Sequence, residues 1–146
     1  MIESYSPSIL QTPFFKEFVC PQISRNLCLL GLDMPNPKYQ WRVQNDITML
    51  RCNEFDTDDY YIAPQALIDS FTNPVYIPAY RISDMEDILP DYAIERKNTL
   101  YTVMIDSLYK VEPVSDYRLA DALALMVHDC IRSRIININN VFRNYT

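Results

Sequence analysis

The sequence predicts an α+β fold, a small antiparallel sheet of short strands with several helices packed on it and a long C-terminal helix. Three observations support this prediction. Ser83 and Glu86 have the spacing of a capping box that begins a helix, and Pro90 ends that helix. Aromatic and β-branched runs typical of strands precede it. An alanine-rich stretch with helical periodicity follows it. We therefore expect one structural layer before the Ser83 helix and a second layer after it.

The N-terminal third is expected to be helical after a loose arm at residues 1–11. Thr12 can cap a short helix that continues to residue 19, and Pro21 breaks or restarts it. A second helix has apolar residues at spacings of four and three from Ile23. Gly31 stands where a left-handed residue would end this helix.

The middle of the chain predicts strands. Residues 39–43 and 47–52 have the composition of a hairpin, residues 54–59 of an acidic turn, and residues 60–62 of a third strand. A helix with Pro64 at its start is expected next. The residues on its inner side are Ala66, Leu67 and Phe71. An extended connection marked by Pro74 and Pro78 then leads to the Ser83 helix, whose apolar face is Met85, Ile88 and Leu89.

The last third mixes strand and helix signals. Residues 98–111 fit a helical stripe, but their β-formers and the pair Asp106 and Ser107 favour a hairpin, which we choose. Ser115 is expected to cap the long helix, with a tail at residues 136–146. The predicted apolar face of this helix is Leu119, Leu123, Met126, Val127, Cys130 and Ile131.

Size and charge exclude several functions. The 146 residues predict one domain spanning 1–146. Gly31 is the only glycine, which excludes glycine-rich phosphate loops and dinucleotide fingerprints. The net charge of −6 argues against direct nucleic-acid binding, since backbone contacts need clustered Lys and Arg. An acidic body with basic residues near the C-terminus is compatible with pairing to a second copy of the chain.

The sequence also indicates a compartment. It contains no apolar run of membrane-spanning length and no signal-peptide pattern at its start, so we expect a cytoplasmic protein with no membrane partner. The cysteines lack metal-ligand spacing, and free buried thiols are expected at Cys20, Cys28, Cys52 and Cys130. No cofactor is expected.

Two polar features are candidates for chemistry. His128, the only histidine, is expected to be a partly exposed helix residue, because positions two apart on a helix diverge and Cys130 cannot pair with it. The acidic run is expected to be a solvated turn, with a weak divalent-cation site as the alternative. Its members are Glu54, Asp56, Asp58 and Asp59.

Aromatic residues crowd the middle third of the sequence. Packing accounts for most aromatic side chains, but tyrosine also provides rigid amphipathic surface for binding. Arginines nearby would allow such a surface to stack a base and hold a phosphate. The candidate binding residues are Tyr39, Trp41, Arg42, Tyr60, Tyr61, Tyr76, Tyr80 and Arg81, with Arg51 as a further nearby cation.

Three segments carry a resemblance. They are Leu-Cys-Leu-Leu-Gly-Leu at 27–32, Ile-Pro-Ala-Tyr at 77–80, and Ala-Asp-Ala-Leu-Ala-Leu at 120–125 with Cys130 after it. In this order they resemble a group of small uncharacterised proteins encoded by phages and mobile elements of Bacteroidetes-type bacteria. The resemblance implies an origin and brings no catalytic residue with it.

Three functional hypotheses follow. The leading one is a small acidic accessory protein of a phage or mobile element that performs no catalysis and binds another protein in the host cytoplasm, a second copy being one candidate. The alternative is an anti-defence protein that sequesters a nucleotide or signalling molecule. The third is a hydrolase that depends on a divalent metal held by the acidic run.

Overall fold

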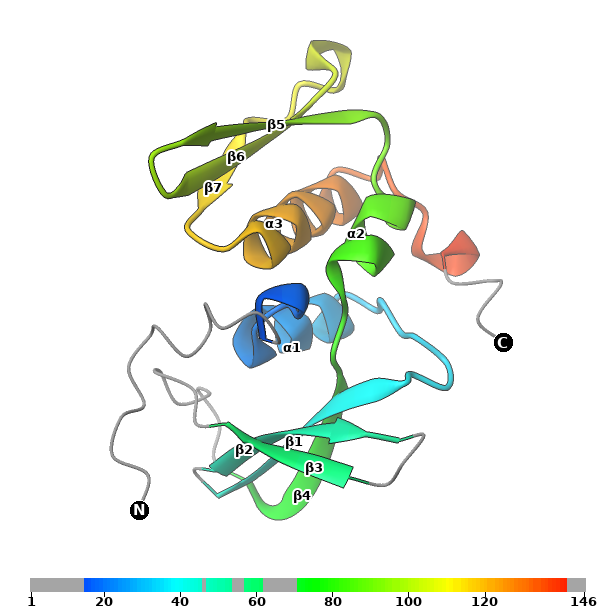
Figure 1. The fold of residues 1–146 in the computed structure, drawn as a ribbon. Helices are drawn as coiled ribbons and strands as arrows, with labels where there is room; N and C mark the ends of the chain where they lie inside the picture. The colour runs from blue at the N-terminus through cyan, green and yellow to red at the C-terminus, as the bar shows by residue number, and fades with distance from the viewer. Residues whose placement is uncertain (1–14, 46, 54–56, 62–70, 142–146) are drawn as a thin grey trace.

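Two antiparallel sheets lie at opposite ends of the molecule, and helices form two layers between them (Figure 1). The structure is a computed structural model that describes residues 15–45, 47–53, 57–61 and 71–141. Its mixture of helices and antiparallel strands confirms the predicted α+β class. The expected single sheet is, however, two sheets, one of four strands and one of three.

The helical elements are η2 (Phe15–Glu17), α1 (Pro21–Leu29), α2 (Ile82–Ile88), η3 (Ser107–Tyr109), α3 (Leu119–Arg132) and η4 (Ile138–Asn140). The strands are β1 (Tyr39–Asn45), β2 (Ile47–Cys52), β3 (Thr57–Tyr61), β4 (Phe71–Pro78), β5 (Tyr92–Lys97), β6 (Leu100–Ile105) and β7 (Val114–Asp116). The four-stranded sheet has the order β3-β2-β1-β4, and the three-stranded sheet has the order β5-β6-β7. Among the described residues, no helix is long and apolar enough to cross a membrane.

The predicted hairpin of residues 39–43 and 47–52 is confirmed by the β1–β2 pair. Trp41 lies opposite Leu50 on β2 and Ile77 on β4, and all three side chains are buried. This row faces η2 and α1, where Phe18 completes the smaller of two hydrophobic clusters. Arg42, the next residue along β1, belongs to the opposite face of the sheet because side chains alternate along a strand.

The structure changes the bounds of two predicted elements, β3 and β4. Strand β3 confirms the predicted third strand at Tyr60 and Tyr61, but it begins at Thr57, so Asp58 and Asp59 are strand residues and not part of the expected acidic turn. The connection with Pro74 and Pro78 is strand β4, which pairs with β1 at the edge of the sheet, where a proline costs no ladder hydrogen bond. Phe71 begins β4 and is not helical. Residues 62–70, with the predicted helix start at Pro64, lie outside the described residues, as do 54–56.

Helix α2 starts one residue before the predicted cap. Its N-cap is Arg81, whose backbone N–H donates to the carboxylate of Asp84 at 2.8 Å. Ser83 therefore lies inside the first turn, and the predicted reach-back role of Glu86 belongs to Asp84. Glu86 instead accepts a hydrogen bond from the Tyr92 hydroxyl.

The predicted hairpin in residues 98–111 is only partly correct. Strand β6 covers its first half, and its hairpin partner is β5, joined through Asn98 with a positive φ of 59°. After β6 the chain makes a 3-10 turn in which the Asp106 carboxylate accepts from the Leu108 N–H. The return strand is β7, so Ser115 and Asp116 are strand residues and not a helix cap.

Helix α3 confirms the predicted apolar face, although it begins at Leu119. Leu123, Met126, Val127 and Cys130 are completely buried. They belong to the larger hydrophobic cluster, which α3 shares with α1, α2 and the three-stranded sheet. Ile136, in the predicted tail, is also buried in this cluster.

The N-terminal segment is described from Phe15 onward, and residues 12–14 of the expected helix, like the expected arm at 1–11, lie outside the described residues. Over the described part of this helix the structure has the single turn η2, and the next residue, Phe18, forms an isolated bridge with Arg81. Pro21 restarts the helix, as one of the two alternatives expected. Gly31 follows α1 with a φ of +100°, which confirms the left-handed position. A Cβ there would lie 2.9 Å from Cδ1 of Ile138, so glycine also makes room for η4.

Candidate functional site

Two of the predicted binding residues are parts of the hydrophobic interior. Trp41 and Tyr80 are both 0% exposed. The Trp41 indole N–H donates to the Val19 carbonyl at 3.0 Å, and the Tyr80 hydroxyl donates to the Leu32 carbonyl at 2.5 Å. Burial, together with the nearby Cys28, raises the pKa of Tyr80. Neither aromatic ring offers surface to a partner.

Two others lie on the outer face of the four-stranded sheet. Arg42 and Tyr76 are register partners on β1 and β4, and Tyr76 is 46% exposed. The Arg42 guanidinium donates to the Gln44 side-chain oxygen at 2.9 Å on the same face. These residues therefore belong to the face of the sheet opposite Trp41.

The acidic run contributes little to the described structure. Asp58 and Asp59 lie in β3, in register with Arg51 and Leu50 of β2. Tyr60 and Tyr61 follow in the same strand. The structure describes the backbone of β3 but not its side chains, and Glu54 and Asp56 lie outside the described residues. Within the described chain, no three His, Cys, Asp or Glu residues are grouped so that they could hold a metal ion.

Tyr39 and Arg81 are brought together, and Lys38 joins them. The Arg81 guanidinium carbon lies 5.5 Å from the centre of the Tyr39 ring and 5.7 Å from that of Phe18. The Lys38 ammonium lies 5.7 Å from the Tyr39 ring centre. Cations at these distances are attracted to the electron-rich faces of the rings. The result is a basic and aromatic corner where β1, β4 and α2 meet.

This corner contains a pocket of about 230 Å³. Its polar lining includes Lys38, Arg81 and Ser83, with Asp84 as the one acid among the lining residues. The Arg81 Nε atom is buried and has no hydrogen-bond partner among the described residues. A buried donor left unsatisfied is costly, so an acceptor placed at this nitrogen would stabilise the corner. No pattern in the sequence connects Lys38 with Arg81, because the two residues are far apart along the chain.

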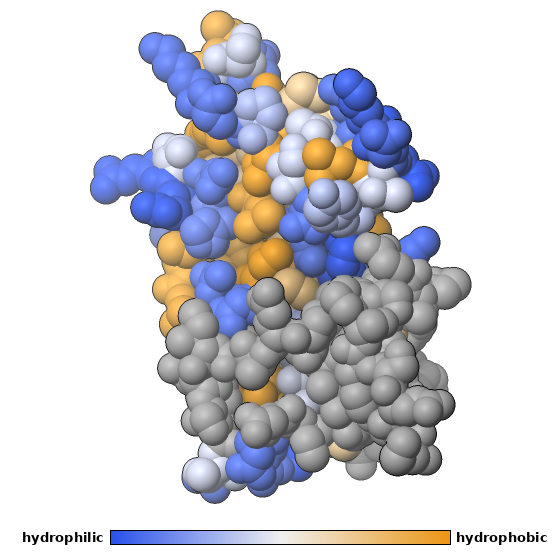
Figure 2. Space-filling view, turned by 90° about the vertical axis from the view of Figure 1, so that its left-hand side faces the viewer, coloured by the Kyte–Doolittle hydropathy of each residue, from blue (hydrophilic) through white to orange (hydrophobic). Residues whose placement is uncertain are grey.

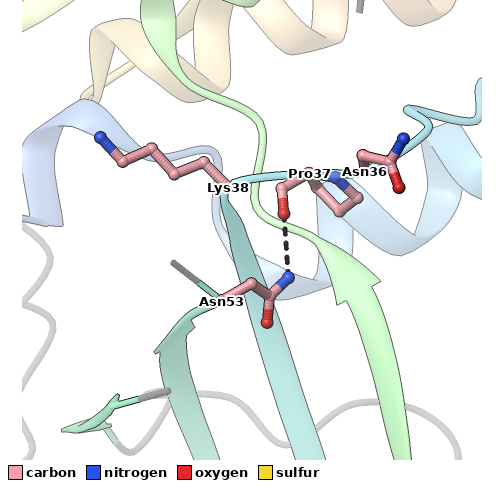
Figure 3. A pocket seen from close by; sticks show the side chains of 4 residues that line it. All are labelled: Asn36, Pro37, Lys38 and Asn53. Atoms are coloured by element: carbon pink, nitrogen blue, oxygen red, sulfur yellow. Dashed lines mark hydrogen bonds between the residues drawn. The ribbon is translucent and has the colours of Figure 1, made fainter. Parts of the chain in front are cut away.

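A second hollow adjoins the first. It has a volume of about 460 Å³ and is lined by Asn36, Pro37, Lys38 and Asn53 (Figure 3). The Asn53 side-chain amide donates to the Pro37 carbonyl at 2.9 Å, which ties the end of β2 to the loop before β1. Asn36 and Lys38 line both hollows, so the two lie on either side of these residues.

A different kind of site is present in the three-stranded sheet, at the outer edge of β5. In the part of the chain that the structure describes, no strand pairs with β5 on the side away from β6. Residues 93–97 are all exposed, and Ile94 is an exposed large apolar residue at 40%. Figure 2 views the molecule from the side of the β5–β6 turn, and in the upper half of the view hydrophobic side chains lie between hydrophilic ones. No local pattern in the sequence predicts β5.

The backbone of β5 offers hydrogen-bonding groups at alternate residues. Lys97 and Leu100 are register partners flanking a two-residue turn, where both bonds of the pair are made. Because bonded and non-bonded pairs alternate along an antiparallel ladder, Ala93 and Glu95 also bond to β6. The N–H and C=O groups of Tyr92, Ile94 and Arg96 therefore point to the open side. The open edge of β5 can be recognised in the sequence only if the strand itself is recognised first.

The histidine and the thiols show no catalytic arrangement. His128 is half-buried, as expected, with Nδ1 3.9 Å from the Asp129 carboxylate. Burial raises the pKa of Cys20 to about 12 and that of Cys130 to about 11, with nearby carboxylates adding to the effect. Thiols with raised pKa values are poor nucleophiles at neutral pH. All four cysteines are free, and Cys52 and Cys130 are buried.

Comparisons of the chain with protein-family models, with curated proteins and with solved structures found no match.

Proposed function

We propose that this chain is a non-enzymatic binding protein that pairs with an extended segment of another polypeptide along the open edge of β5. The observation that supports the proposal is the row of outward backbone groups at Tyr92, Ile94 and Arg96. An added strand gains affinity from main-chain hydrogen bonds and selectivity from the side chains beside it. A phage or mobile-element origin, suggested by the sequence resemblance, is compatible with such an accessory role.

The composition of β5 also favours pairing. Proteins usually protect a sheet edge with a proline, a bulge, a very short strand or a covering segment. Strand β5 is six residues long, contains no proline and keeps an unbroken register with β6. Ile94 adds an exposed apolar side chain that a partner strand would cover. The remaining protection is charge at residues 95–97, and its effect depends on what lies opposite.

The proposal is tested by photo-crosslinking in the native host. With Ile94 replaced by a benzophenone amino acid, we expect one dominant crosslinked protein whose attached peptide forms an extended segment. Glu112, an exposed residue in the loop before β7, is the matched control position and should give no such product. Amide exchange at Tyr92, Ile94 and Arg96 should slow in the isolated complex, while Ala93 and Glu95 should change little. The same products from both positions, or none from position 94, would contradict the proposal.

The pocket at Arg81 supports a second candidate function, the binding of a small anion such as the phosphate of a nucleotide. The specific observation is the buried Arg81 Nε, which has no acceptor within the described part of the chain and lies next to Lys38 and the Tyr39 ring. An arginine donates bidentately to phosphate, and an aromatic ring can stack a base. The acid Asp84 in the lining is already engaged by the Arg81 backbone N–H.

Phosphate titration followed by NMR tests this second function. Inorganic phosphate and a nucleoside monophosphate should both shift the Tyr39 and Arg81 resonances, and the nucleotide should bind more tightly. Arg81→Met is expected to weaken the affinity by roughly tenfold or more, since a charge-assisted hydrogen bond contributes about 1.5–3 kcal/mol. Arg96→Met is the matched control, because Arg96 also lies over a tyrosine ring, 5.3 Å from the centre of Tyr101, but away from the pocket. Equal losses in both variants would exclude a specific anion site.

The metal-dependent hydrolase stays a prediction. It depends on Glu54, Asp56, Asp58 and Asp59, and the side chains of these residues lie outside the described residues.

A further inference from the structure

We infer that the extended segment that pairs with β5 is β5 of a second copy of this chain, in a symmetric antiparallel arrangement centred on Ile94. This inference rests on the proposed function, because it names the partner for the same open edge. The two three-stranded sheets would then join into one continuous sheet of six strands.

The direction of the backbone groups limits which residues of β5 can bond to a new strand. The outward groups belong to Tyr92, Ile94 and Arg96, so only these residues can form the bonded pairs of a new antiparallel ladder. Centring the pair on Ile94 places Ile94 opposite its own copy, and Tyr92 opposite Arg96 on both sides. Every outward N–H and C=O of the strand then has a partner. No other symmetric register uses all three residues.

The register centred on Ile94 also brings complementary side chains together. Ile94, which is 40% exposed in the single chain, packs against Ile94 of the second copy. Tyr92 faces Arg96, an aromatic–cation pair. Asp91, the residue before β5, comes opposite Lys97, the last residue of β5 in the other copy, so opposite charges meet. Symmetry makes both of these pairs twice.

The neighbouring registers are less favourable than the one centred on Ile94. A centre on Ala93 leaves Arg96 without a bonded partner and sets Asp91 opposite Glu95. A centre on Glu95 leaves Tyr92 without one and sets Glu95 opposite its own copy. Like charges directly across a ladder are destabilising. The charges of β5 therefore disfavour the shifted registers and favour the one centred on Ile94.

The edge of β5 has room for a strand of a second copy. Helix α3 packs against β6 and β7, while the side chains of β5 from residue 93 to residue 97 are exposed. The edge of β5 also lies in the layer farthest from the four-stranded sheet (Figure 1). A second strand can therefore be added without displacing a described element. In the joined sheet, both copies of α3 lie on the same face, because the symmetry axis runs perpendicular to the sheet.

Sedimentation velocity over a range of protein concentrations tests the inference through charge reversal. Asp91→Lys would face Lys97, and Lys97→Asp would face Asp91, so each single variant should weaken the dimer by at least about fivefold. The double variant Asp91→Lys with Lys97→Asp restores opposite charges and should regain most of the wild-type affinity. Glu112→Lys and Lys110→Asp carry the same changes in net charge at exposed positions outside the interface, and should dimerise as the wild type does.

Disulfide trapping provides the second measurement. In the proposed register the two Cα atoms at position 94 are about 5.5 Å apart, within the range of a disulfide. Ile94→Cys should therefore form a covalent dimer under mild oxidation, whereas Glu112→Cys and the wild type should not. A wild type that stays monomeric at all concentrations, or a double variant as weak as the single ones, would overturn the inference. If a different protein still crosslinks at position 94, the proposed function stands without the dimer. If nothing crosslinks there, both fail.

Discussion

Replacing Asp121 with alanine is expected to lower the free energy of unfolding by about 3–5 kcal/mol, because it removes the carboxylate partner of a buried arginine. The Arg118 Nη1 and Asp121 Oδ2 atoms are 2.7 Å apart, and both side chains are only 6% exposed. The other Asp121 oxygen accepts the backbone N–H of Cys20 at 2.8 Å. Urea unfolding followed by circular dichroism measures the loss.

The same arginine connects the N-terminal segment to α3. Its Nη2 atom donates to the carbonyls of Phe15 and Phe18 at 2.6 and 2.7 Å. Arg118→Met should therefore also destabilise the protein. The double variant Arg118→Met with Asp121→Leu should lose less than the sum of Arg118→Met and Asp121→Ala, because no buried charge is left unpaired. A loss below about 1 kcal/mol for Asp121→Ala, near the scale of a surface substitution, would contradict the structural role given to this pair.

Trp41→Ala is expected to lower the free energy of unfolding by a similar amount, about 3–5 kcal/mol. Trp41 is completely buried, its ring lies 6.3 Å from the Phe18 ring in an edge-to-face arrangement, and its N–H bonds to Val19. The substitution leaves a cavity and removes the shorter of the two hydrogen bonds to the Val19 carbonyl, whose other donor is the Ser24 hydroxyl. Thermal and urea unfolding measure the change.

Tyr76→Ala is the matched control, since Tyr76 is an aromatic residue of the same sheet that is 46% exposed on the opposite face. The Tyr76→Ala variant should change the free energy of unfolding by no more than about 0.5 kcal/mol. If the two variants lost equal stability, the division of the sheet into an inner and an outer face would be wrong. Neither variant should change the binding properties of the β5 edge in the folded protein.

The elements that sequence predicted well are those whose signals are local. Helix α3 shows helical periodicity, and Gly31 marks a helix end by its own backbone freedom. Strand β5 could not be found in the same way. Its burial does not alternate, since five of its six residues are exposed, and its extended form depends on pairing with β6. Ser115 resembles a helix cap, but pairing of β7 with β6 overrides that preference.

The candidate sites escaped prediction for a related reason. Lys38 and Arg81 are far apart in the sequence, and the antiparallel pairing of β1 with β4 brings the strand ends beside them together. Arg118 looks like an ordinary surface charge, and only the folded chain shows that carbonyls and Asp121 surround it. In the sequence, only the residue type marks the aromatic side chains as candidates for binding. Burial then separated Tyr39, which lines the pocket, from Trp41 and Tyr80, which do not.

Phe18 and Val19 are adjacent in the chain but belong to different hydrophobic clusters. Phe18 belongs to the cluster between the four-stranded sheet and α1, and Val19 belongs to the cluster around α3. The Val19 backbone also forms hydrogen bonds to both halves: its N–H donates to the Tyr80 carbonyl, and its carbonyl accepts from the Trp41 indole N–H. Any opening that withdraws this segment exposes both clusters at once. The two halves are therefore expected to unfold as one cooperative unit, with tryptophan fluorescence and helical circular dichroism changing at the same denaturant concentration.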